Sequence, residues 1–80
     1  MFSGTVEIDL HGKNAYQARV ALDALLRRVD ASVYRIRVIH GFNSGTRLKE
    51  TVWEYASHPK VRRIAAGESP GCSYLILREY

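Results

Sequence analysis

The sequence predicts an α/β protein, more narrowly an α+β two-layer sandwich with its elements in the order β-α-β-α-β-β. Two observations carry this prediction. In the first, apolar and polar residues alternate in short segments, which is typical of strands. In the second, apolar residues recur at helical spacing in two longer segments, which lie between the first and second and between the second and third of the alternating segments. A helix between two strands implies a right-handed crossover with parallel pairing, whereas a short turn before the last strand implies an antiparallel hairpin. We therefore expect a mixed four-stranded sheet with two helices on one face.

The first strand–helix–strand unit begins at residues 5–10, where apolar and polar side chains alternate. Asn14 is a favourable N-cap, and Gln17 three positions later completes a capping box, so the first helix is predicted at residues 15–29. Residues 33–39 form the second predicted strand. The two strands are therefore expected to pair in parallel.

The second helix is predicted to follow a glycine-bearing turn. Ser44 and Thr46 are both suitable N-caps, so the helix is expected to begin near one of them. Pro59 cannot continue a helix, which places the end near Ser57 or His58.

The last two strands are predicted at residues 61–66 and 73–80. The segment between them, residues 67–71, contains two glycines, a serine and a proline, which are typical turn residues. A connection this short favours an antiparallel pair.

One face of the predicted sheet carries charged residues. Because side chains alternate along a strand, Glu7, Asp9, Arg35 and Arg37 share a face that is opposite to the apolar residues of their strands. The helices are expected to cover the apolar face, which leaves the charged face at least partly open as a docking surface.

The composition is typical of one folded domain, which we assign to residues 1–80. The single cysteine, Cys72, excludes an internal disulfide framework and is typical of a reducing compartment. No apolar run approaches the roughly 18 residues of a membrane span, so we expect a cytoplasmic protein without membrane contact and, by default, a monomer. The net charge of +4 favours polyanions, although it is also compatible with a merely solubilising surface.

A His-Gly pair ends each of the first two predicted strands. His11-Gly12 and His40-Gly41 are 29 residues apart, about one strand–helix unit. If the strands are parallel neighbours, both histidines lie at the carboxyl edge of the sheet, where ligands of open α/β sheets bind. Backbone N–H groups in such glycine-rich turns attract anions, phosphate above all.

Residues 8–12, Ile-Asp-Leu-His-Gly, and residues 40–45, His-Gly-Phe-Asn-Ser-Gly, resemble the two signature motifs of the Smr (small MutS-related) domain family. The resemblance covers nearly the whole chain and implies a stand-alone member. Asn43 replaces the middle glycine of the second motif, but asparagine tolerates left-handed backbone. The resemblance implies a fold like the C-terminal domain of a bacterial translation initiation factor. It also implies binding of DNA or RNA, with nicking endonuclease activity in some members.

Three residues are the candidate catalytic groups. Histidine is the side chain best suited to proton transfer near neutral pH, which points to His40 and His11. Asp9 shares a face with His11, where it can orient the imidazole or hold a divalent cation. The alternatives are that His40 bonds only its own turn and that Asp9 forms a cross-strand ion pair with Arg35 or Arg37. No protein-built metal site is expected, and a cation such as Mg²⁺ is considered for cleavage only.

The candidate phosphate-binding residues surround the two motifs. Phe42 either stacks on an unpaired base or closes the loop as an apolar lid. A nicking enzyme, a non-catalytic binding module and a protein adaptor all stay open at this point. The full set is Gly12, Lys13, Gly41, Phe42, Asn43, Ser44, Gly45, Thr46, Arg47 and Lys49.

Three further side chains are assigned to packing. Tyr16 and Trp53 are predicted to be partly in the core. Cys72, next to the last turn, is predicted to be a small buried residue and not a nucleophile, because no neighbouring residue in the sequence activates it.

Overall fold

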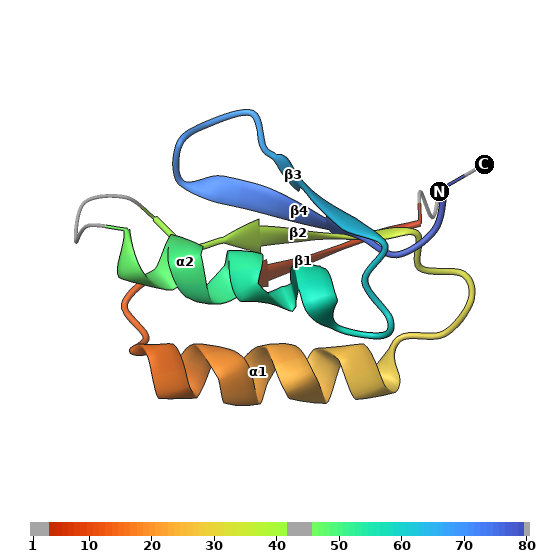
Figure 1. Cartoon of the computed structure of the whole chain (residues 1–80), viewed down its shortest axis with the longest axis horizontal. Helices are drawn as coiled ribbons and strands as arrows, with labels where there is room; N and C mark the ends of the chain where they lie inside the picture. Colours follow the sequence, from red (N-terminus) through yellow and green to blue (C-terminus); the bar gives the residue numbers. More distant parts are fainter. Residues whose placement is uncertain (1–3, 42–45, 80) are drawn as a thin grey trace.

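The four strands of the described residues form one mixed sheet in the order β1-β2-β4-β3, with both helices packed on one face (Figure 1). The structure is a computed structural model and describes residues 4–41 and 46–79. The elements are β1 (Thr5–Asp9), α1 (Ala15–Arg28), β2 (Arg35–Ile39), α2 (Arg47–Trp53), the 3₁₀ helix η1 (Glu54–Ser57), β3 (Arg63–Ala66) and β4 (Cys72–Ile76).

The strand pairing confirms the predicted mixed sheet. β1 and β2 are parallel, with Ile8 opposite Val38, and α1 makes the crossover between them. β4 is antiparallel to β2 and to β3, so the last strand of the chain lies in the middle of the sheet. All five residues of β4 are consequently buried, although the sequence alone does not indicate this position.

The ends of the strands differ from the prediction. β4 ends at Ile76 and not at residue 80, although the backbone N–H of Leu77 still donates to its in-register partner, the Tyr34 carbonyl, at 2.7 Å. The N–H of Arg78 donates to the same carbonyl at 3.1 Å, so the alternating pairing of the ladder stops there. The other observed strands are one or two residues shorter than the predicted ranges 5–10, 33–39 and 61–66.

The capping box of α1 is confirmed. The side chain of Asn14 accepts the backbone N–H of Gln17 at 2.8 Å, and the side chain of Gln17 accepts that of Asn14 at 3.0 Å. Thr46 occupies the N-cap position of α2, but its hydroxyl donates to Glu50 at 3.0 Å and caps no backbone group. The helical region then continues through η1 and ends at Ser57, as predicted.

The core lies between the sheet and the helices. The apolar face of the sheet meets the buried stripe of α1 and the buried side of α2. None of the helices in the described ranges is long and apolar enough to cross a membrane. The fully buried apolar residues of the described ranges are Leu10, Ala18, Leu22, Leu26, Ile36, Val38, Val52 and Leu75.

No helix of residues 4–41 and 46–79 lies on the opposite face of the sheet, as predicted. It carries the charged side chains of β1 and β2 together with Cys72, Tyr74 and Ile76 of β4. These three β4 side chains are nevertheless at most 9% exposed. Glu68 contacts Cys72 and Tyr74, and the Arg35 guanidinium lies over the Tyr74 ring.

Candidate functional site

The turns after β1 and β2 lie side by side. A Cβ placed on Gly41 would be 3.5 Å from the Cβ of His11, and the Leu10 N–H donates to the Ile39 carbonyl at 2.7 Å. Gly12 and Gly41 both have positive φ, at +82° and +76°, which a side chain would strain. The two His-Gly pairs therefore meet at the carboxyl edge of the sheet.

An open cavity of about 590 Å³ lies at this edge and extends onto the helix-free face of the sheet. It brings together both predicted histidines, the predicted carboxylate and two of the predicted glycines. Its lining residues are Asp9, His11, Gly12, Arg37, Ile39, His40, Gly41, Ser69, Gly71 and Cys72.

Asp9 and His11 form a hydrogen-bonded pair. Asp9 Oδ1 lies 2.6 Å from His11 Nδ1 and 3.0 Å from the His11 backbone nitrogen. Because a carboxylate only accepts, Nδ1 carries the hydrogen, and these bonds lower the pKa of Asp9 below its ordinary value of 3.8. The His11 side chain is 71% exposed, and its Nε2 has no partner among the described residues. This geometry holds the imidazole in one orientation and leaves its Nε2 available for a further hydrogen bond.

The alternative that Asp9 pairs with a strand arginine is wrong. Arg35 Nε donates to Thr5 at 2.9 Å, whereas Arg37 pairs with Glu7 and Glu68.

His40 is only 2% exposed, and both of its ring nitrogens are bonded. Its Nδ1 donates to the Gly41 carbonyl at 2.9 Å, so its Nε2 accepts the Ser73 hydroxyl at 3.0 Å. The Ser73 oxygen in turn accepts the Trp53 indole N–H at 3.0 Å. These hydrogen bonds give both ring nitrogens of His40 a partner, as in the alternative in which His40 bonds only its own turn.

Two of the predicted phosphate-binding cations lie together. Lys13 and Arg47 line one open cleft of about 340 Å³ between the first turns of α1 and α2. Lys49 is exposed on α2, with its ammonium 5.9 Å from the Trp53 ring centroid. Thr46 is exposed and bonded to Glu50. Four predicted residues, Phe42, Asn43, Ser44 and Gly45, lie outside the described ranges.

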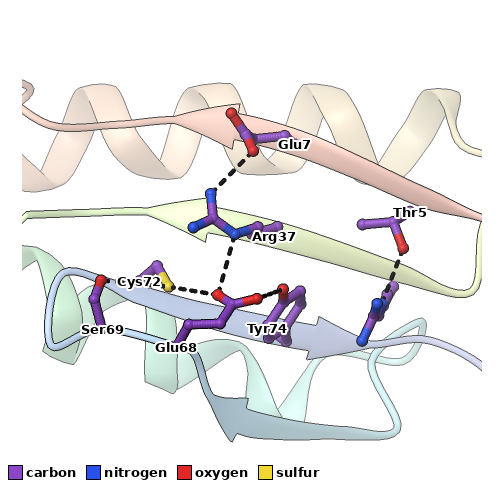
Figure 2. A network of polar contacts seen from close by, with 8 residues as sticks. Thr5, Glu7, Arg37, Glu68, Ser69, Cys72 and Tyr74 are labelled. Atoms are coloured by element: carbon purple, nitrogen blue, oxygen red, sulfur yellow. Dashed lines mark hydrogen bonds and ion pairs between the residues drawn. The ribbon is translucent and has the colours of Figure 1, made fainter.

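A carboxylate that the sequence analysis did not single out organises the open face (Figure 2). Glu68, from the turn between β3 and β4, accepts from the Tyr74 hydroxyl at 2.5 Å, Cys72 Sγ at 3.4 Å and Arg37 Nε at 3.3 Å. Bonds from Tyr74, its own backbone and Cys72 lower the pKa of Glu68 to about 2. The alternation of β2 places Arg37 on this face, but only the position of β4 brings Glu68 to it.

The Glu68→Gln variant is expected to lose stability relative to the wild type in a pH-dependent way. The ordinary pKa of 4.5 falls to about 2 on folding, so the carboxylate contributes fully above pH 4.5 and loses its contribution as the pH falls toward 2. The difference in melting temperature between the two proteins should therefore shrink over that interval, as thermal melts followed by circular dichroism would show. A difference in melting temperature that does not change with pH would show that the ionised Glu68 carboxylate is not its cause.

The packing predictions have mixed outcomes. Cys72 is buried at 4% exposure, as predicted. Tyr16 is 74% exposed, so its assignment to the core is wrong: it projects outward from the first turn of α1. Trp53 is 37% exposed, with its N–H bonded inward to Ser73.

The donor atoms for a metal ion are few. Among the described residues, no group of three His, Cys, Asp or Glu side chains is placed to hold a metal.

Comparisons with known proteins agree with this fold and with the motifs. A family model described as the Smr domain matches residues 8–71. The crystal structure of the Smr domain of Thermus thermophilus MutS2 aligns with a TM-score of 0.79 and 23% identity, covering 92% of this chain and 99% of that one. At this identity, the structural likeness supports the fold alone. No curated protein matches the sequence significantly.

Proposed function

The chain belongs to the Smr domain family, and from this premise we propose that it binds DNA or RNA at the His-Gly rim and cleaves one strand there. The His-Gly rim comprises residues 9–13, 40, 41 and 47. Smr domains generally bind nucleic acids, and nicking endonuclease activity occurs in the family. The proposal assigns both properties to this chain.

The Asp9–His11 pair beside the open cavity is the observation that carries the proposal. In phosphodiester cleavage, the attacking oxygen bonds to phosphorus while the bond to the leaving oxygen breaks. His11 Nε2 would accept the proton of the attacking hydroxyl, or, when protonated, donate to the leaving oxygen. Asp9 holds the ring in the required tautomer, as the carboxylate does in an Asp-His pair.

Supercoiled plasmid and a structured RNA test the catalytic part. Wild-type protein is expected to convert one of these substrates to nicked or cut product, and parallel reactions with EDTA report metal dependence. The Asp9→Ala/His11→Ala double variant should show no such product. His58→Ala is the matched control, because His58 is the C-cap residue of η1, accepts the Lys60 N–H and does not line the cavity at the rim. Equal product from the wild type and the double variant would end the enzymatic claim.

A binding module without catalysis is the second candidate function. The cleft between the first turns of α1 and α2 favours it, because Lys13 and Arg47 border the rim without any part in the Asp9–His11 pair. Such cations contact phosphates and position the strand.

Removing one of these cations is expected to flatten the salt dependence of binding. Each lost phosphate contact lowers the slope of log K against log salt by about 0.7–0.9. Lys13→Ala and Arg47→Ala should each do so in fluorescence anisotropy titrations with a labelled oligonucleotide. Arg78→Ala, an exposed cation near the opposite end of the sheet, should leave the slope unchanged. Binding that does not depend on salt would count against both candidate functions.

A further inference from the structure

Arg37 lies inside the same cavity as the Asp9–His11 pair but has no part in it. Its Nη1 donates to Glu7 at 3.0 Å, and its Nε donates to Glu68 at 3.3 Å. The Arg37 side chain is therefore held from both sides and is only 28% exposed. Its Nη2 has no acceptor among the described residues. In Figure 2 this nitrogen points along β2 toward the carboxyl end of the strand, where the cavity lies.

The charge around Arg37 does not favour a phosphate. Two carboxylates, Glu7 and Glu68, flank one guanidinium, and the Asp9 carboxylate lines the same cavity. A phosphate at this point would approach three negative charges and only one positive charge that is already paired. The free N–H groups of Nη2 instead suit an uncharged group that carries hydrogen-bond acceptors. The phosphate-binding cations lie elsewhere, at Lys13 and Arg47.

The shape of the cavity suits a flat aromatic group. Ile39 and Cys72 are opposite one another in the β2–β4 register and form an apolar floor beside Arg37. Gly12, Gly41 and Gly71 border the cavity without side chains. The volume of about 590 Å³ lies within the roughly 300–1,000 Å³ of small-ligand sites.

We infer that this cavity is a pocket for one unpaired nucleobase and that Arg37 is the residue that hydrogen-bonds the base. The inference rests on the proposed function and specifies its substrate. A base inside a duplex is stacked and cannot enter a pocket, so the substrate is single-stranded or locally unpaired at the cleavage point. Guanine offers two acceptors on one edge, O6 and N7, and is the base that arginine contacts most often.

Oligonucleotides with identical phosphate charge test the pocket directly. One ligand is a deoxyribose strand of abasic residues with a single central guanine, and the other is the same strand without any base. Wild-type protein is expected to bind the guanine strand about tenfold more tightly in anisotropy titrations, as for one stacked base. Arg37→Gln should lose this preference and keep its affinity for the fully abasic strand.

Arg35→Gln is the matched control. Arg35 is on the same strand and face, lies 4.7 Å from the centroid of the Tyr74 ring, and does not line the cavity. It should retain the preference for guanine. Equal loss in both variants, or equal affinity of the wild type for the two strands, would overturn the inference and leave nucleic-acid binding intact. Failure of the wild type to bind either strand or any other nucleic acid would instead overturn the proposed function.

Discussion

His11→Ala is expected to lower the rate of strand cleavage by about 10²- to 10⁴-fold, the usual contribution of a general acid or base. His11 Nε2 is the one ring nitrogen at the rim that is exposed and unpaired within the described residues. The affinity of the His11→Ala variant for the same substrate should be retained, because Lys13 and Arg47 are unchanged. Single-turnover cleavage and anisotropy titrations of the same oligonucleotide separate the two effects.

In the proposed mechanism, Asp9 acts through His11 and is a positioning residue. Asp9→Asn is expected to lower kcat and leave the affinity for nucleic acid unchanged, since the carboxylate bonds His11 on the ring nitrogen away from the substrate. Asp9→Glu, which restores the negative charge, should recover part of the rate. A loss of affinity with unchanged kcat would show instead that Asp9 contacts the substrate.

His40→Ala is expected to reduce the free energy of unfolding by about 3 kcal/mol, because it removes a buried ring and leaves buried polar groups unpaired. For a domain of this size, this loss corresponds to a decrease of roughly 15 °C in melting temperature. Differential scanning calorimetry checks the value.

Ser73→Ala is the companion variant. It removes the hydroxyl that lies between His40 and the Trp53 indole, and the expected loss is about 1–3 kcal/mol. If His40→Ala keeps wild-type stability but abolishes cleavage, His40 is catalytic and not structural. If both variants lose stability and the remaining folded protein still cleaves, His40 only supports the turn.

Most of the fold could be predicted because its signals are local. The capping box at Asn14 and Gln17 begins α1, and alternation places the side chains of β1 and β2 on their correct faces. The strand ends could not be predicted, because Leu77 and Arg78 bond to Tyr34, far away in the sequence. Tyr16 was predicted to be partly in the core, but its position on α1 faces solvent.

The candidate site was predictable in part. The spacing of the two His-Gly pairs places them at one edge, and the alternation of β1 pairs Asp9 with His11. Alternation already separates the two histidines: His11 is in phase with Asp9 on the open face of β1, whereas His40 is in phase with Val38 on the buried face of β2. The strand order adds to this difference, because β1 is an edge strand and β2 is central.

The sequence by itself determined the element order, the parallel first pair, the capping box of α1 and the Smr family of the chain, because each follows from neighbouring residues or fixed spacings. Only the tertiary structure decided that β4 enters between β2 and β3. That insertion supplies Ser73 to His40, Glu68 to Arg37 and Cys72 to the cavity floor. Pairing between distant strands depends on packing over the whole sheet, which no local pattern records.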